Sequence, residues 1–199
     1  YLSSDQSFVH LHVHSQYSLL EATSEFDALA TRAKEFGMPA IALTDYGNMF
    51  GAIEFYFAAK KEELKPILGL DAYLAPKTRF IKGDDPEAAK MPNRRIVLLA
   101  QDHTGYQSLC KISSAGYQEG FYYRPRIDDE VLAKNSEGII ALSGGFMGDI
   151  PYTFRTFGKD KTLERILFYQ KLYGDRFYLE MNRTGLKEWD EINPFLLEV

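Results

Sequence analysis

Three of the chain's four histidines, His10, His12 and His14, alternate with apolar residues in one run near the N-terminus. Alternate side chains of a β-strand point to the same face, so this spacing predicts three imidazoles on one face of a strand over residues 8–15. Imidazole is the commonest neutral metal ligand, and two of them two residues apart can hold one ion or bridge two. The run therefore indicates a metal site. The alternative is a buried strand whose histidines are hydrogen-bonded and hold no metal.

The length and composition of the chain limit the classes of protein to which it can belong. With 199 residues, 45% of them hydrophobic, the chain can bury one substantial core, and a single domain over residues 1–199 is expected. The net charge of −5 argues against a chain whose main role is to coat nucleic acid. The single cysteine, Cys110, cannot form an intramolecular disulfide, which suits a reducing compartment such as the cytoplasm. No apolar run approaches the roughly 20 residues of a membrane span.

The ends of the chain indicate a fragment of a longer protein. It lacks an initiator Met, and residues 193–199 end within an apolar stretch without a helix stop signal.

Strand patterns alternate with helix patterns along the chain. Buried strands followed by helices predict a parallel sheet, either open and doubly wound or closed into a barrel. The first helix is predicted to begin with a capping box at Ser24–Asp27. The predicted strands are residues 40–44, 67–74, 96–100, 138–142 and 177–181, and the later helices are residues 50–63, 104–117 and 161–173.

Two segments interrupt this alternation. Residues 76–95 are polar, mildly basic and without periodicity, which predicts a long mobile loop. Residues 121–126 combine aromatic residues with arginines. Such a segment can stack bases and hold phosphates, or its arginines can stack on tyrosines to close the domain surface.

Polar residues collect where the predicted strands end. In folds made of strand-then-helix units, ligands bind at the carboxyl ends of the strands, and the helix N-termini there favour a phosphate. Asp45 in this position has an equally good alternative reading as an ordinary turn residue. The residues in question are His12, His14, Asp45, Asp71 and Gly145.

The ordered motifs at residues 8–21, 44–48, 65–73, 104–107 and 138–145 resemble the polymerase and histidinol phosphatase (PHP) domain family, most closely the copies at the N-terminus of bacterial DNA polymerase III alpha subunits. The resemblance implies a distorted seven-stranded, TIM-like β/α barrel, here truncated before its last strand. It also implies a cluster of up to three zinc or manganese ions. Family members hydrolyse phosphoesters, and in some polymerases the domain is described as a 3′-5′ exonuclease.

The family's metal ligands are only partly retained. His12 and His14 match the leading pair. Glu21 stands where these polymerases usually have an aspartate, and Asp71 stands where they usually have a glutamate. The remaining matched positions carry Tyr46, Arg95 and Gly145 where the family has histidine, histidine and cysteine. A guanidinium has no lone pair to donate, and a neutral phenol is a poor ligand. We therefore expect His12, His14, Glu21 and Asp71 to hold at most one ion, with His10, Asp45, Tyr46, Arg95 and Gly145 around them.

The resemblance implies a domain of a DNA-directed DNA polymerase that is mainly structural or partner-binding. Its partners would be the rest of the alpha subunit, a proofreading exonuclease subunit and, through the parent chain, DNA, with Mg²⁺ serving the polymerase domain elsewhere. The alternatives are an active metal-dependent phosphoesterase or exonuclease, a stand-alone enzyme like histidinol phosphatase, and an unrelated β/α barrel.

Overall fold

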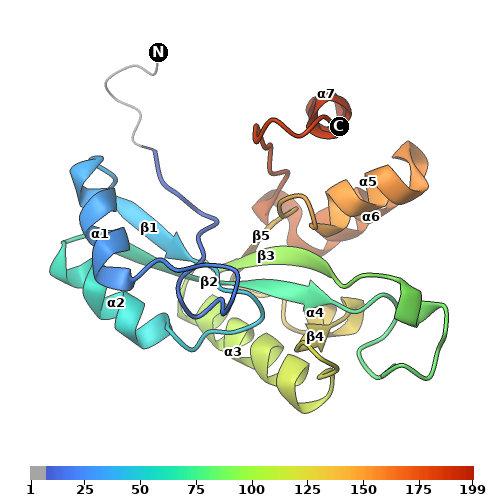
Figure 1. The fold of residues 1–199 in the computed structure, drawn as a ribbon, viewed down its shortest axis with the longest axis horizontal. Coiled ribbons are helices and arrows are strands. Elements are labelled where there is room, and N and C mark those ends of the chain that lie inside the picture. Colours follow the sequence, from blue (N-terminus) through green and yellow to red (C-terminus); the bar gives the residue numbers. More distant parts are fainter. Residues whose placement is uncertain (1–7) are drawn as a thin grey trace.

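The computed structural model describes residues 8–199, which fold around one mixed sheet (Figure 1). The strands follow the order β1-β2-β3-β5-β6, and β4 pairs with β2 off this path. Short apolar runs form the central strands because both of their faces are covered. The strands are β1 (Ala40–Leu43), β2 (Lys65–Leu74), β3 (Arg94–Ala100), β4 (Arg126–Ile127), β5 (Ile139–Leu142) and β6 (Phe177–Tyr178).

The sheet is not wholly parallel, and the prediction of a parallel sheet is wrong at β3. The pairs β1–β2, β2–β4 and β5–β6 are parallel, whereas β3 is antiparallel to both β2 and β5. A parallel neighbour requires a crossover connection, usually an α-helix. The connection from β2 to β3 contains only the 3-10 turn η1 (Ala88–Lys90), so the chain returns beside β2 in the opposite direction.

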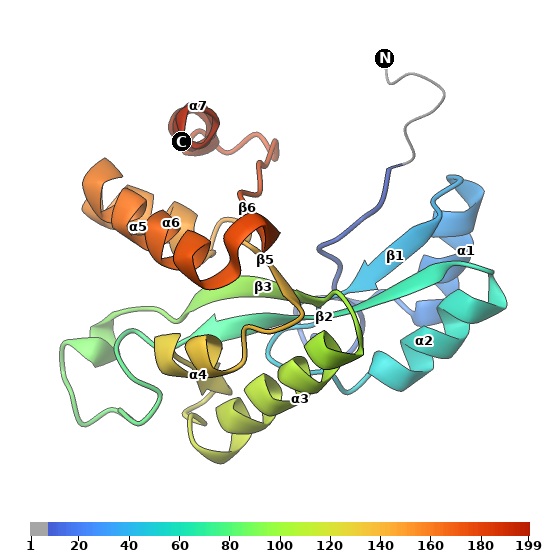
Figure 2. The same cartoon turned by 180° about the vertical axis from the view of Figure 1, so that it is seen from behind.

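Helices cover the sheet in three groups, seen from both sides in Figures 1 and 2. Helices α1 and α2 pack on each other beside β1, helices α3 and α4 lie on one face, and α5 and α6 lie on the other. The helices are α1 (Phe26–Glu35), α2 (Ala52–Lys61), α3 (His103–Gln118), α4 (Asp129–Lys134), α5 (Asp149–Phe157), α6 (Lys159–Tyr173) and α7 (Trp189–Glu198), and a 3-10 turn, η2 (Gly174–Arg176), precedes β6.

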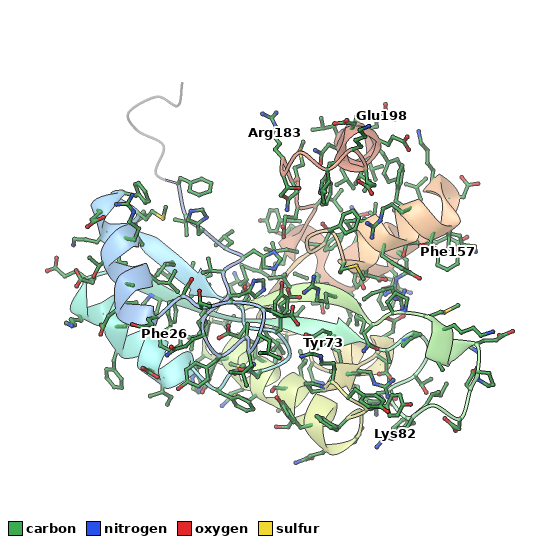
Figure 3. The ribbon with its side chains drawn as sticks, in the orientation of Figure 1. Phe26, Tyr73, Lys82, Phe157, Arg183 and Glu198 are labelled. Carbon is green, nitrogen blue, oxygen red and sulfur yellow. The ribbon has the colours of Figure 1, made fainter. Side chains whose placement is uncertain are left out.

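The largest hydrophobic core lies between the sheet and helices α3, α5, α6 and α7. Leu98 from β3, Ile112 from α3 and Tyr169 from α6 are each fully buried in it. A second cluster joins α1, α2 and β1 around Phe26 and Phe55. Figure 3 shows Phe26 on α1, at the far end of the molecule from Phe157. The central strands are therefore held rigidly from both sides, which fixes the positions of residues at their ends.

The helix periodicities identify α1, α2, α3 and α6 to within a few residues. The predicted capping box is wrong, because α1 begins after Glu25 and has no side-chain cap. Helix α3 instead has a side-chain cap that was not predicted, since the Asp102 carboxylate accepts the Gly105 N–H at 2.9 Å. Helices α4, α5 and α7 were not predicted, since they are short or interrupted by Pro194.

The polar segment between β2 and β3 has no regular structure apart from η1, and it is anchored by one buried arginine. Arg79 is 6% exposed and contacts Glu119, Asp128 and Glu130 at 2.6, 2.8 and 2.9 Å. Lys82, at the outer part of the same segment, lies at the edge of the molecule (Figure 3). The segment therefore has a fixed base as well as an exposed outer part.

The arginines of residues 121–126 stack on tyrosines. The Cζ atom of Arg126 lies 5.2 Å from the ring centre of Tyr122, and that of Arg124 lies 5.5 Å from the ring centre of Tyr73. Arg126 is buried, and its guanidinium donates to the backbone carbonyls of Gly120 and Ile81. These contacts favour the reading in which the segment closes the domain surface.

Candidate metal centre

The histidine run is not a β-strand, which corrects the first prediction. The segment does run alongside β1, where the Ala42 N–H donates to the His10 carbonyl and the Thr44 N–H to the Val13 carbonyl, at 3.0 and 2.8 Å. Ala42 of β1 and Thr44, which follows β1, are two positions apart, whereas His10 and Val13 are three positions apart, so the segment has one extra residue. An extra residue of this kind breaks the two-residue alternation, as in a β-bulge.

The interrupted alternation separates His10 from the other two histidines. His10 is exposed and packs edge-to-face on Phe8, with ring centres 4.8 Å apart. His12 and His14 are each half-buried, with ring centres 5.0 Å apart. Of the three alternating imidazoles, two face the site.

His12, His14 and Asp71 form the centre of the site. Oδ2 of Asp71 lies 3.0 Å from Nε2 of His12 and 3.2 Å from Nε2 of His14. One ligand atom from each of the three residues lies within 4.8 Å of the other two. Asp71 is only 1% exposed because it sits in the middle of the sheet, on β2.

Glu180 completes the surroundings of His12 and was not predicted. Its two carboxylate oxygens lie 3.1 and 3.0 Å from Nδ1 of His12, which precedes it by 168 residues. Glu180 follows β6 by two residues, and its N–H donates to the Ser143 hydroxyl at the end of β5. The rule that ligands gather at the carboxyl ends of strands could have identified it, because residues 177–181 were predicted to be a strand.

The carboxylates on either side of His12 control its protonation. Burial alone would lower the pKa of His12, but hydrogen bonds with Asp71 and Glu180 raise the pKa from 6.5 to about 10. Burial would likewise raise the pKa of Asp71, whereas its contacts with His12 and His14 hold that pKa below its usual value. Without a metal, His12 is therefore an imidazolium between two carboxylates at neutral pH.

This protonation makes the stability of the metal-free protein depend on pH. A pKa that is higher in the folded state means that folding binds a proton, so the stabilisation is complete below pH 6.5 and is lost as the pH rises toward 10. We expect the free energy of unfolding, measured with urea after metal removal, to fall by about 1 kcal/mol or more over this range. His12→Gln should flatten the profile. Equal slopes for the two proteins would contradict the assignment.

The donor set fits one divalent ion. Oδ1 of Asp71 is buried and has no hydrogen-bond partner within the described residues, so the carboxylate whose Oδ2 faces both histidines has unused acceptor capacity. The contact between Glu180 and Nδ1 of His12 is the arrangement that directs the other ring nitrogen toward a metal. His12, His14 and Asp71 together offer the nitrogen and oxygen donors that zinc and manganese accept.

Tyr46 and Arg95 stack beside His14. The Tyr46 ring lies 3.9 Å from the His14 ring, nearly parallel to it, and the Cζ atom of Arg95 lies 4.4 Å from the Tyr46 ring centre. Burial raises the pKa of Tyr46 above 10.0, although Arg95 opposes the rise, so the phenol stays protonated at neutral pH. Arg95 also helps to lower the pKa of Asp71, which places its charge close to the donor set.

Glu21 and Gly145 contribute no ligand atom to this centre. The Glu21 carboxylate pairs with Arg124 at 3.3 Å and is absent from the donor cluster. Gly145 lies over His12, and a Cβ atom built on it would be 3.9 Å from the His12 ring and 4.0 Å from the Glu180 carboxylate. Those are ordinary contact distances, so a Cβ atom fits at this position.

Asp45 lies behind the donors, 1% exposed, and its carboxylate accepts hydrogen bonds from Ser15 and Ser18. The turn that follows requires glycine. Gly47 has φ +66°, and a Cβ atom there would lie 2.8 Å from Pro125 and 2.9 Å from Tyr73.

Comparisons with known proteins agree with this geometry. The PHP domain family profile matches residues 10–184. The chain is 44% identical over 197 residues to the DNA polymerase III subunit alpha of Borreliella burgdorferi, and 41% identical over 194 residues to that of Treponema pallidum. These matches cover 99% and 97% of the chain but only 17% and 16% of the two relatives.

A solved structure shares the fold. It comes from Bifidobacterium adolescentis, is provisionally named a metal-dependent phosphoesterase, and matches with a TM-score of 0.57 at 12% identity. The match covers 97% of this chain and 84% of the other. The α/β fold class is thereby confirmed, and the seventh strand stays a prediction. Within residues 8–199, no helix is long and apolar enough to cross a membrane.

Proposed function

The chain belongs to the PHP domain family, and from this membership we propose that it is the PHP domain of a bacterial DNA polymerase III alpha subunit, acting mainly as a structural and partner-binding module. Identities of 38 to 44% to three such subunits, over nearly the whole chain, support the proposal. The single domain over residues 1–199 would be one part of a DNA-directed DNA polymerase. Nucleotide addition, with Mg²⁺, would take place elsewhere in that protein.

The position of Arg95 is the main observation indicating that this site holds fewer metal ions than the three-ion cluster of the family. Its guanidinium has a fixed positive charge and lies over Tyr46, which in turn stacks on His14. A fixed cation at this distance repels a second metal ion and stabilises the nearby Asp71 carboxylate instead. The site would therefore hold at most one ion.

His12, His14 and Asp71 are the residues that would hold this ion, which we propose to be zinc or manganese. A bound ion of this kind acts as a Lewis acid on a phosphoester oxygen and lowers the pKa of water. Glu180 accepts the Nδ1 proton of His12 and thereby keeps Nε2 available as a ligand atom. Glu21 pairs with Arg124 and is not part of this set.

An active phosphoesterase or 3′-5′ exonuclease is the second candidate. The observation in its favour is that His12, His14 and Asp71 converge on one point, with Glu180 on the far side of the His12 ring holding it in place. Tyr46, Arg95 and Gly145 argue against it, because none of them supplies a ligand for the further ions that the family's chemistry uses.

The proposed partners are the remainder of the polymerase chain and a separate proofreading exonuclease, in the bacterial cytoplasm, with DNA bound through the parent chain. Exposed aromatic residues of the segment 121–126 are candidates for the exonuclease contact. Phe121 is 49% exposed, and Tyr123 is 83% exposed and has φ +58°. Aromatic residues are enriched in protein interfaces, and backbone strain of this kind occurs at functional surfaces.

The test compares the full-length protein with its Asp71→Asn variant. We expect nucleotide incorporation on a primed template to be unchanged by this substitution. Hydrolysis of a phosphodiester with manganese or zinc should be near background in both proteins. Asp27→Asn on the exposed face of α1 is a matched carboxylate control. Phosphodiester turnover in the natural protein that Asp71→Asn abolishes would establish the second candidate instead.

A further inference from the structure

The two histidines lie on a segment that regular β-pairing does not hold. Instead of a β-sheet hydrogen-bond ladder, the side chains of the residues that follow β1 hold the histidine segment in place. The Thr44 hydroxyl accepts the Val13 N–H at 2.9 Å and donates to the Val13 carbonyl at 3.0 Å. Val13 lies between His12 and His14, so this contact fixes the backbone at the centre of the donor pair.

Asp45 fastens the next part of the segment with both carboxylate oxygens. Its Oδ1 accepts the Ser15 N–H at 2.7 Å and the Ser18 hydroxyl at 2.6 Å, and its Oδ2 accepts the Ser15 hydroxyl at 2.7 Å. Asp45 is 1% exposed, and none of these donors carries a charge. A buried carboxylate is costly unless its hydrogen bonds are satisfied, so this arrangement is expected to be specific.

The backbone of Asp45 contacts the other half of the site. Its carbonyl accepts the Asp71 N–H at 3.1 Å, and the Asp71 carbonyl accepts the Gly47 N–H at 2.9 Å. One residue thus binds the histidine segment through its side chain and the β2 ligand strand through its backbone. Asp45 is thus a direct link between the segment that carries His14 and the strand that carries Asp71.

We infer that Asp45 is a positioning residue that sets the geometry of His12 and His14 against Asp71. The inference deepens the proposed metal site and rests on it for its effect on metal affinity. The contacts between Asp45 and the histidine segment are all made by protein groups, so the effect on that segment can be tested without a metal.

Asparagine cannot reproduce these contacts. The Ser15 hydroxyl donates its own proton to Asp45 at 2.7 Å and accepts the Tyr17 N–H at 3.2 Å, so an asparagine amide in place of that carboxylate oxygen would require the hydroxyl to turn its proton away. Asparagine has one acceptor oxygen in place of two, and its amide would face one of the donors. Asp45→Asn therefore removes contacts while keeping the size of the side chain, and Asp45→Ala removes all of the side-chain contacts.

The experiment uses the full-length protein with Asp45→Asn, Asp45→Ala and a control, Asp128→Asn. Asp128 is also a buried carboxylate that accepts backbone N–H groups, from Arg79 and Val131, but it caps α4 away from the site. Hydrogen–deuterium exchange is measured on the metal-free protein for the peptide covering residues 8–19. Zinc affinity is measured by competition with a chelator, below the unfolding temperature of every variant.

Both Asp45 variants should accelerate exchange in residues 8–19 and weaken zinc binding by about 10- to 100-fold. Asp128→Asn should lower thermal stability without either effect. Equal exchange and equal zinc affinity for Asp45→Ala and Asp128→Asn would overturn the inference. If the natural protein binds no zinc, the metal site fails, and the exchange data alone then decide whether Asp45 positions the segment.

Discussion

Replacing His12 and His14 together by alanine is expected to abolish zinc and manganese binding by this domain, whereas His10→Ala leaves it unchanged. The first two imidazoles lie 3.0 and 3.2 Å from the same oxygen of Asp71. His10 is exposed, packs on Phe8 and is not in the donor cluster. Without the imidazoles, Asp71 and Glu180 remain as separate carboxylates, which bind transition metals weakly in water.

Metal content per chain, measured by mass spectrometry after loading and desalting, checks this result. His10→Ala is the matched control, since it removes the same side chain from the same segment. A loss of metal in His10→Ala would show that the segment is arranged differently. Two or more ions in the natural protein, lost in the double variant, would favour the nuclease candidate. Tyr46 and Arg95 would then not limit metal binding.

Restoring the family's residues at the replaced positions should increase metal binding. The combined variant is Tyr46→His, Arg95→His and Gly145→Cys. It removes the fixed charge beside Asp71, places an imidazole against His14, and adds a thiol over His12 and Glu180, where a Cβ atom fits. We expect at least one further ion per chain, together with phosphodiester hydrolysis above background, because added ligands and a removed cation act in the same direction.

The same metal analysis measures the gain, and thermal unfolding establishes that the variant folds. Gly145→Ala in the same background is the control, because it adds the Cβ atom without the thiol. A folded variant with unchanged metal content would mean that Tyr46, Arg95 and Gly145 do not limit the site. The proposal that these three residues lower the number of bound metal ions would then be wrong.

Local patterns in the sequence determined most of the secondary structure. The apolar run of β3 and the helical spacing of α3 identify these elements because each is set by residues close together in the chain. The pair His12 and His14, and Asp71 on β2, were identified as candidate ligands in the same way, with the resemblance to PHP domains adding their roles. The structure brings these three residues together.

The tertiary structure decided which residues share the site. His10 packs on Phe8 and is not in the donor cluster, in a segment whose regular alternation is broken by one extra residue. Glu21 pairs with Arg124, 103 residues later, while Glu180 reaches His12 across 168 residues. The direction of β3 likewise followed from a connection without an α-helix. Residue spacing determines local periodicity, but the alignment of an unpaired segment and contacts between distant residues depend on how the whole chain packs.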